Sequence, residues 1–219
     1  LSTSAYIKDA LQSLSVSSSL LSSPYRTEQC RFEAIRFDRN NLIVVSRISK
    51  AKGSDFLCSF LRCCHNLGRT VNLYHFGEVN EDAATDLMQV QQLDCINWHS
   101  EGFQKSKRKI YSKGILLHLN PKEPLGVILL ECVSFGVPFL TFNSGGTGEI
   151  ARNMGLEKYT CGATETGWEE CLILMWDNFK KLDEDALQNE IRFGFTRGLE
   201  YYDPFSYAER LDELLTGKM

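Results

Sequence analysis

Short apolar runs alternate with amphipathic segments along the chain from residue 41 onward. The run LIVV at 42–45 is aliphatic and rich in β-branched residues, which is typical of a strand that is buried on both faces. Similar runs predict further strands at 71–76, 94–98, 115–119, 138–142 and 158–161. Because segments of helical periodicity separate these strands, the pattern predicts a Rossmann-like, doubly wound α/β fold with a mainly parallel sheet.

The segments between the strands predict helices, and more helices follow the last strand. Apolar residues recur at helical spacing after Gly53, and Gly68 is placed to cap the end of that helix. Asp183 is suited to capping a later helix. The other expected helices span 81–90, 104–111, 125–136, 148–154, 166–181, 185–199 and 204–215. Before residue 41 the pattern is weaker and predicts a helix at 5–14 and an edge strand at 31–37.

Composition narrows the class of protein. The chain has 219 residues, of which 43% are hydrophobic and 24% charged, as in ordinary globular domains. Its net charge of -4 argues against a general nucleic-acid binder, which normally carries a basic stripe. No apolar run is long enough to predict a transmembrane helix.

The eight cysteines do not form a recognisable metal-binding motif. The sequence contains no CxxC pair, and Cys63, Cys64 and His65 are consecutive on an expected helix, so they cannot converge on one ion. A zinc site is therefore not expected, and reduced thiols are the expected state of the cysteines.

The expected helix at 125–136 is apolar on nearly all sides apart from Glu131. Such a helix is normally buried, and an isolated buried carboxylate is very costly. Glu131 therefore needs either a cationic partner elsewhere in the chain or a ligand in a water-filled cleft. The helix alone leaves both alternatives open.

The loops at the carboxyl ends of the strands carry the unusual residues, and ligands of open parallel sheets bind at that edge. Arg47 and Lys52 follow the first strand, Gly126 lies in the first turn of the apolar helix, and a glycine-rich loop at 144–148 precedes the next helix. Helix N-termini and cations both favour anions. Together these features predict a diphosphate site, with Glu131 about 7–8 Å further along the helix, where it suits a ribose.

Two segments resemble the retaining GT-B glycosyltransferases of family 4, also called glycosyl transferases group 1. In EPLGVILLE, Glu123 and Glu131 enclose seven residues, like the Glu-x7-Glu motif of that family, and CVSFGVPFLTFNSGGTGEI continues the similarity. IVVSRISKAKGSDFL is similar to the first strand and loop of the family's carboxy-terminal domain, with Arg and Lys five positions apart. The resemblance runs in order from about residue 41 to residue 154.

The resemblance implies a role for each residue of these motifs. Glu123 would be the catalytic residue that contacts the donor sugar, and Glu131 would hold the ribose. The donor diphosphate would be held by Arg47, Lys52, Leu125, Gly126 and Val127. The donor-side glycine loop would consist of Ser144, Gly145, Gly146 and Thr147. The nucleobase would lie near Trp98, His99 and Gly102. Cations and helix ends would stabilise the charge on the departing nucleoside diphosphate, so neither a metal nor another cofactor is expected.

The resemblance also implies how the chain is organised and what it does. Residues 1–40 would be a remnant of an amino-terminal acceptor domain or a linker, 41–200 the nucleotide-sugar-binding domain, and 201–219 a carboxy-terminal helix. The expected activity is transfer of a hexose-type sugar to a surface glycan such as lipopolysaccharide or capsule. The partners would be a nucleoside-diphosphate sugar and a glycan or lipid-linked acceptor. The protein would be cytoplasmic, and peripheral contact with the inner face of the membrane is a further possibility that the resemblance allows.

Two alternatives remain open at this point. The chain could be a non-catalytic nucleotide-binding module, since the acceptor half is missing. An NAD-type Rossmann protein fits less well, because no GxGxxG follows the first strand. The basic run at 105–109 is expected to be a solvated helix face, and contact with anionic lipid headgroups is the minority interpretation.

Overall fold

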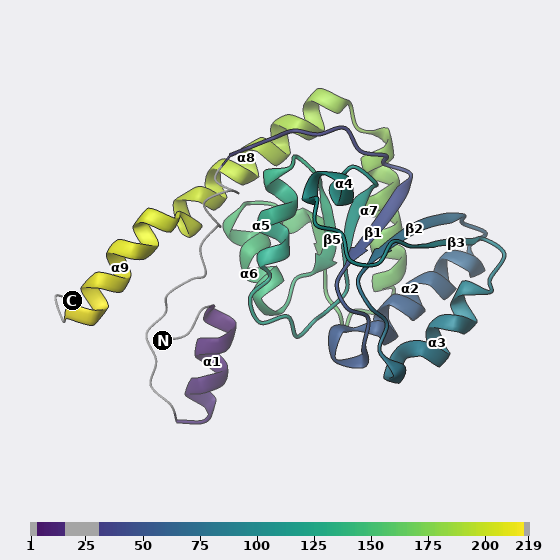
Figure 1. Cartoon of the computed structure of the whole chain (residues 1–219), viewed down its shortest axis with the longest axis horizontal. Coiled ribbons are helices and arrows are strands. Elements are labelled where there is room, and N and C mark those ends of the chain that lie inside the picture. Colours follow the sequence, from purple (N-terminus) through teal and green to yellow (C-terminus); the bar gives the residue numbers. More distant parts are fainter. Residues whose placement is uncertain (1–3, 16–30, 217–219) are drawn as a thin grey trace.

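The alternating apolar runs form a parallel sheet. The computed structural model describes residues 4–15 and 31–216 (Figure 1). Its strands are β1 (Asn41–Val45), β2 (Val71–Phe76), β3 (Ile96–Ser100), β4 (Ile115–His118), β5 (Phe139–Phe142) and β6 (Thr160–Cys161). They are hydrogen-bonded in the order β3-β2-β1-β4-β5-β6, and all the pairings are parallel. The Rossmann-like, doubly wound class is therefore confirmed.

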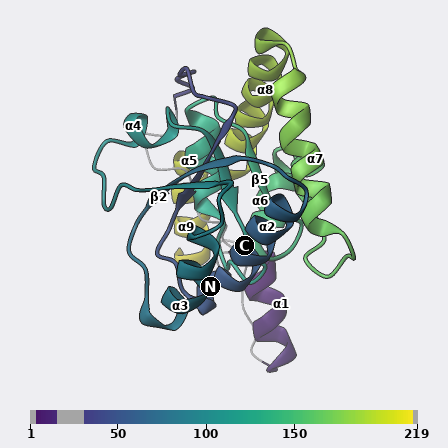
Figure 2. The ribbon, with the colours of Figure 1, turned by 90° about the vertical axis from the view of Figure 1, so that its right-hand side faces the viewer.

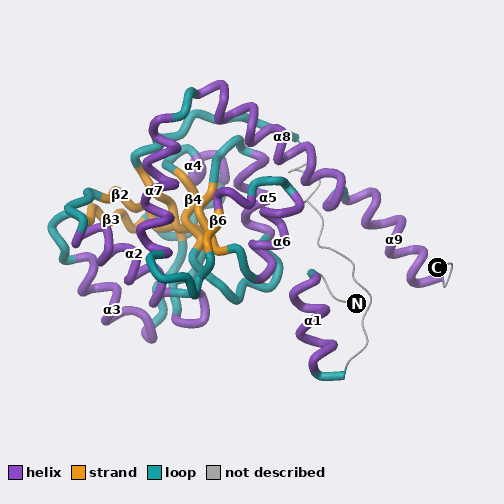
Figure 3. The backbone as a smooth tube through the Cα atoms, turned by 180° about the vertical axis from the view of Figure 1, so that it is seen from behind, coloured by secondary structure: helices purple, strands orange, loops and turns teal. Residues whose placement is uncertain are grey.

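Helices cover both faces of this sheet (Figures 1 and 3). On one face α2 (Ser54–Asn66) packs against α3 (Glu81–Gln91) and α7 (Trp168–Lys181). On the other, α5 (Val127–Ser134) packs against α6 (Gly145–Asn153) and α8 (Glu184–Tyr202). The aromatic rings of Phe56, Phe142 and Trp168 meet with centroids 5.1 to 5.7 Å apart and join α2, β5 and α7.

The order of the strands fixes where a ligand can bind. From β1 the chain proceeds outward to β2 and β3, and from β4 it proceeds the other way to β5 and β6. The loops after β1 and β4 therefore diverge and leave a crevice at the carboxyl edge of the sheet, the usual ligand position in such folds. Both strands are buried, and Leu42 pairs with Ile115 at the centre of the sheet.

The apolar helix is buried as expected but begins later than its pattern suggests. Leu129, Leu130, Cys132 and Val133 have no exposed surface. The helix starts at Val127 rather than at residue 125, because Gly126 has a φ of 65°, a left-handed conformation that cannot continue a right-handed helix. Gly126 is thus the N-cap of α5 and does not lie in its first turn.

Two expected elements differ at the edges of the fold. The strand expected at 31–37 is not formed. Instead, the backbone N–H groups of Glu33 and Ile35 donate to the carbonyls of Ser134 and Phe135 at the end of α5, groups that the helix itself leaves unpaired. Helix α4 (Lys107–Tyr111) is shorter than expected, because Ser106 caps it by accepting a hydrogen bond from the Lys109 N–H.

Other boundaries shift by two or three residues. Helix α6 (Gly145–Asn153) begins at Gly145 rather than at residue 148, so the expected glycine-rich loop is instead the first turn of this helix. Strands β3 and β6 each begin two residues later than expected.

Gly68 ends α2 in a left-handed conformation, and the Asp183 carboxylate accepts hydrogen bonds from the first amides of α8, so both expected caps are confirmed. Helix α8 continues to Tyr202, which places the expected domain boundary at residue 200 inside a helix. The 3-10 helices η2 (Lys50–Lys52) and η3 (Glu157–Tyr159) precede α2 and β6.

The terminal helices extend from the body of the molecule. Helix α9 (Pro204–Thr216) prolongs the line of α8 (Figure 1), whereas α1 (Ala5–Ser13) lies at the opposite end of the molecule from the turn between α7 and α8 (Figure 2). The Glu149 carboxylate of α6 accepts a hydrogen bond from the Ala5 N–H, and this contact fixes α1. No helix within the described ranges combines the length and hydrophobicity needed to cross a membrane.

Gly53 provides a test of the packing at the crevice. It has a φ of 80°, and a Cβ atom there would lie 1.9 Å from the Leu119 carbonyl oxygen, at the end of the neighbouring strand. Gly68, at the other end of α2, has a φ of 65° but an open surrounding. Alanine should cost about 1–2 kcal/mol at either position through the left-handed backbone. Gly53→Ala should lower the free energy of unfolding by about 1–3 kcal/mol more, because it separates two loops.

Equilibrium unfolding in urea, with Gly68→Ala as the matched control, measures the difference between the two variants. Equal losses in the two variants would show that the close approach of the Gly53 and Leu119 backbones does not contribute to stability.

Candidate functional site

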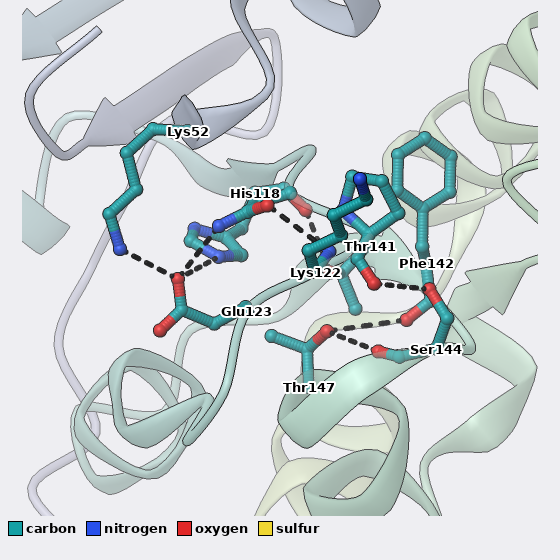
Figure 4. Close-up of polar contacts among 10 residues, drawn as sticks. Lys52, His118, Lys122, Glu123, Thr141, Phe142, Ser144 and Thr147 are labelled. Carbon is teal, nitrogen blue, oxygen red and sulfur yellow. Dashed lines mark hydrogen bonds and ion pairs between the residues drawn. The ribbon is translucent and has the colours of Figure 1, made fainter. Parts of the chain in front are cut away.

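Lys52 and Glu123 meet at the crevice between β1 and β4 (Figure 4). Lys52 ends η2 after β1, and Glu123 lies in the loop after β4. The Lys52 Nζ atom is 3.0 Å from Oε2 of Glu123, and the two side chains are 38% and 15% exposed. The sequence placed these residues at one edge of the sheet, and the structure shows that they are in direct contact.

Two further side chains surround the same carboxylate oxygen. The Asn120 amide donates a hydrogen bond of 3.0 Å to Oε2 of Glu123. The Nε2 atom of His118, the last residue of β4, lies 3.7 Å from Oε2, and His118 is only 7% exposed. Among the described residues, Lys52, Asn120 and His118 all approach the Oε2 atom of Glu123. The Oε1 atom points away from these three side chains (Figure 4).

These neighbours keep Glu123 ionised. The close approach of the His118 imidazole, followed by that of the Lys52 ammonium, lowers the pKa of Glu123 to about 2, even though burial acts in the opposite direction. A carboxylate with this pKa is negatively charged at neutral pH. It can accept hydrogen bonds or stabilise positive charge, but it does not act there as a general acid.

Arg47 lies in the same loop as Lys52 and is exposed to solvent. The loop is held at its start by His75, whose Nε2 atom is 2.9 Å from the Ser46 carbonyl oxygen. It is held again where the Ile48 N–H donates to the Glu78 carbonyl at 2.8 Å. No acidic side chain among residues 4–15 and 31–216 forms an ion pair with Arg47, so this exposed cation can contact an anion directly.

The glycines expected in a loop form the first turn of α6 after the Ser144 N-cap, and this turn packs directly against the loop that carries Glu123. The Gly146 N–H donates to the Glu123 carbonyl at 2.6 Å, and a Cβ atom on Gly146 would lie 2.5 Å from the Pro124 carbonyl oxygen. A Cβ atom on Gly126 would lie 2.7 Å from the Thr147 nitrogen. Ser144 adds a hydrogen bond from its hydroxyl to the Pro121 carbonyl. Close backbone packing therefore explains why glycine is required at positions 126 and 146. Direct contact of residues 144–147 with a donor remains a prediction.

Glu131 has partners on α4. The Tyr111 hydroxyl donates a hydrogen bond of 2.7 Å to Oε1 of Glu131, and the Lys107 Nζ atom lies 3.0 Å from the same oxygen. Glu131 is 12% exposed at the side chain, and Tyr111 is fully buried. The cationic partner that the sequence left open is therefore present. Residues 105–109 of the basic run are all exposed, as expected for a solvated face, and Lys107 pairs with Glu131 from this face. The ribose contact of Glu131 remains a prediction.

The residues expected near the nucleobase divide between the two faces of the edge strand. Trp98 and His99 lie within β3 rather than in the loop after it, because the strand extends to Ser100. The Trp98 ring lies 5.6 Å from that of His75, whereas the His99 ring stacks on Tyr74 at 4.4 Å. Adjacent side chains of a strand point to opposite faces, so Trp98 and His99 cannot contact one base together. Gly102 lies in the loop that follows, with an open surrounding.

Several residues of this site do not follow from the sequence motifs. His118 had a detectable signal, since it is a polar residue that ends an otherwise apolar strand at the ligand-binding edge. Lys107 and Tyr111 had none, because their contact with Glu131 depends on how α4 packs beside α5. A small cavity of about 20 Å³ lies between the ends of β1 and β4 and is lined by Lys52 and His118.

Acid titration tests the environment of Glu123. Its pKa is about 2 in the folded chain and near 4.5 when unperturbed. The native contacts of a carboxylate with a lowered pKa stabilise the fold above the unfolded pKa, and this stabilisation is lost as the pH falls toward the folded pKa. The difference corresponds to at most about 3 kcal/mol.

We expect the free energy of unfolding of the native chain, relative to that of Glu123→Gln, to decrease between about pH 4.5 and pH 2. Urea unfolding at a series of pH values measures this difference. A difference that is constant over the whole range would mean that Glu123 titrates normally and is not held by Lys52 and His118.

Comparisons with known proteins agree with this architecture. HepE from Anabaena, solved in complex with UDP and glucose, superimposes with a TM-score of 0.72 at 15% identity; the match covers 98% of this chain and 62% of HepE. A glycosyltransferase from Rickettsia africae gives 0.69 at 13% identity, covering 97% of this chain and 61% of that one. WaaG, described as a glycosyltransferase involved in lipopolysaccharide biosynthesis, gives 0.66 at 16% identity, covering 99% and 62%.

The structural matches show the fold, which is that of one half of a GT-B glycosyltransferase, and the chain spans about three fifths of the length of these neighbours. A search of curated proteins found no match. The family model described as glycosyl transferases group 1 matches residues 26–164, which is more than half of the chain. The chain therefore belongs to the glycosyl transferases group 1 family.

Proposed function

We propose that the chain is the donor-binding part of a retaining glycosyltransferase that takes a hexose-type sugar from a nucleoside diphosphate. The observation that carries the proposal is the contact between Lys52 and Glu123 at the point where the strand order reverses. It brings a cation suited to a diphosphate beside a carboxylate suited to a sugar, at the usual ligand edge of such a sheet. The UDP and glucose bound to HepE support this class of ligand.

The diphosphate would lie between the first loop and the start of α5. Arg47 is exposed, and Lys52 is more than a third exposed at its side chain, so both can approach an anion. The first amides of α5, at Val127 and beyond, follow the Gly126 cap and add the positive end of the helix. As the bond to the sugar breaks, negative charge on the departing diphosphate would be stabilised by groups already in place.

Glu123 would act on the sugar side of the same site. Its Oε2 atom is occupied by Lys52 and Asn120, so Oε1 is the atom assigned to the donor sugar. Its low pKa keeps it anionic, and it would support positive charge at the reacting carbon of the sugar. Glu131, oriented by Tyr111 and Lys107 at one oxygen, would accept hydrogen bonds from the ribose.

The acceptor would come from a second domain. The chain spans 62% of the length of HepE and WaaG. The description of WaaG as a glycosyltransferase involved in lipopolysaccharide biosynthesis supports a surface glycan of that kind as the product. The acceptor would be a growing glycan or a lipid-linked glycan.

Calorimetric titration with nucleotides tests the donor site. The native chain should bind a nucleoside diphosphate more tightly than the matching monophosphate, because Arg47 and Lys52 contact the terminal phosphate. Lys52→Ala should weaken binding of the diphosphate about tenfold or more and reduce the preference over the monophosphate. Glu131→Gln should weaken both nucleotides to a similar extent, since both contain the ribose.

Lys50→Ala is the matched control, because Lys50 is an exposed cation two residues from Lys52. A screen of UDP, GDP, ADP and CMP identifies the base. Absence of binding at millimolar concentration, or binding that is unchanged in Lys52→Ala, would refute the proposed donor site.

The proposal also predicts that this chain binds donor without transferring sugar, because the acceptor half is supplied by another domain. Incubation with a nucleotide sugar and glycan acceptors, followed by mass spectrometry of the glycans, should detect no product. Transfer by the isolated chain would show that it contains an acceptor site of its own.

A further inference from the structure

A cluster of three possible metal ligands lies outside the donor site. His65 is in the last turn of α2, and Asp94 and Cys95 immediately precede β3. Thirty residues of sequence separate His65 from Cys95, so the cluster is produced by the fold and not by a local motif. This set differs from Cys63, Cys64 and His65, whose consecutive positions on a helix prevent them from binding one ion together.

The distances within the cluster fit one ion. The Nδ1 atom of His65 lies 3.4 Å from Oδ1 of Asp94 and 3.4 Å from Sγ of Cys95, and the three ligand atoms are all within 4.8 Å of one another. Zinc is bound tetrahedrally at about 2.0–2.3 Å by nitrogen, oxygen and sulfur, so neighbouring ligand atoms are roughly 3.3–3.7 Å apart. Only a small movement of the Asp94 and Cys95 side chains is needed to complete this geometry.

The backbone holds the three residues in place. At the end of α2 the Gly68 N–H donates to the His65 carbonyl at 2.9 Å. The turn before β3 is fixed by the Ile96 N–H on the Leu93 carbonyl at 3.0 Å and by the Val71 N–H on the Cys95 carbonyl at 2.9 Å. Because the segments are already ordered, binding an ion requires little ordering of the chain.

The cluster is accessible and separate from the donor site. The side chains of His65 and Asp94 are 40% and 91% exposed, so an ion can enter and a water molecule can take the fourth position. Val71 pairs with Ile96, so the cluster lies beside the first residues of β2 and β3. In a parallel sheet this is the edge opposite to the strand ends that carry Lys52 and Glu123.

We propose that His65, Asp94 and Cys95 form a surface site for a borderline-soft divalent cation such as Zn²⁺. Nδ1 of His65, a carboxylate oxygen of Asp94 and the Cys95 thiolate supply three positions, and solvent supplies the fourth. A mixed nitrogen, oxygen and sulfur set of this kind disfavours Mg²⁺ and Ca²⁺, which prefer oxygen ligands. The proposal is independent of the donor site and does not involve a metal in sugar transfer.

Titration of the reduced, full chain with Co²⁺, a spectroscopic substitute for Zn²⁺, tests the proposal. We expect a thiolate-to-cobalt charge-transfer band and tetrahedral ligand-field bands that saturate at one equivalent and disappear when Zn²⁺ is added. Cys95→Ser should abolish the charge-transfer band, and His65→Gln should weaken Zn²⁺ binding by more than about tenfold. Cys63→Ser is the control, since it removes a thiol two residues from His65 but outside the cluster.

Circular dichroism establishes that each variant is folded, and His65→Gln replaces Cys95→Ser as the decisive variant should the latter fail to fold. A chain that shows no charge-transfer band, a band that persists in Cys95→Ser, or binding unchanged in His65→Gln would overturn the proposal. Loss of the band in Cys63→Ser would overturn it as well, because the thiol involved would then be a different one.

Discussion

The contact between Lys52 and Glu123 is the interaction on which the rest of the site depends. It connects the loop after β1 with the loop after β4, the two loops that diverge where the strand order reverses. An ion pair at a partly exposed position contributes little stability by itself. Its value lies in geometry, because it fixes a cation and a carboxylate at a set distance before any ligand arrives, and such preorganisation is what electrostatic catalysis requires.

Close backbone packing makes this arrangement possible. Gly53 allows the first loop to approach the Leu119 carbonyl, and Gly126 and Gly146 allow the loop of Glu123 to approach the first turn of α6. Side chains at these positions would force the loops apart. The glycines therefore affect the charged residues indirectly. They allow the loops to pack closely, and the positions of the loops determine the positions of Lys52 and Glu123.

The sequence predicted the fold well because the fold is determined by local patterns. Apolar runs such as 42–45 mark buried strands, and the alternation with helices implies a parallel sheet. Errors occurred where tertiary contacts decide the outcome. Residues 31–37 pair with the end of α5 and not with a strand, and the left-handed Gly126 delays the start of α5. His99 faces away from Trp98 because β3 continues to Ser100.

The site was only partly predictable for the same reason. The positions of Arg47, Lys52 and Glu123 follow from the ends of strands, which the sequence locates. The partners of Glu131 do not, because Lys107 and Tyr111 reach it through the packing of α4 beside α5. The cluster of His65, Asp94 and Cys95 likewise arises from the pairing of β2 with β3, which spacing in the sequence does not reveal.

The central claim is that the crevice between β1 and β4 holds the diphosphate of a sugar donor. Amide chemical shifts in a titration with UDP, followed by nuclear magnetic resonance, test it most directly. We expect the amides of Arg47, Lys52 and Val127 to shift together and saturate, whereas those of Asp94 and Cys95 at the opposite edge should not shift. Shifts confined to other parts of the molecule, with Lys52 and Val127 unaffected at saturation, would contradict it.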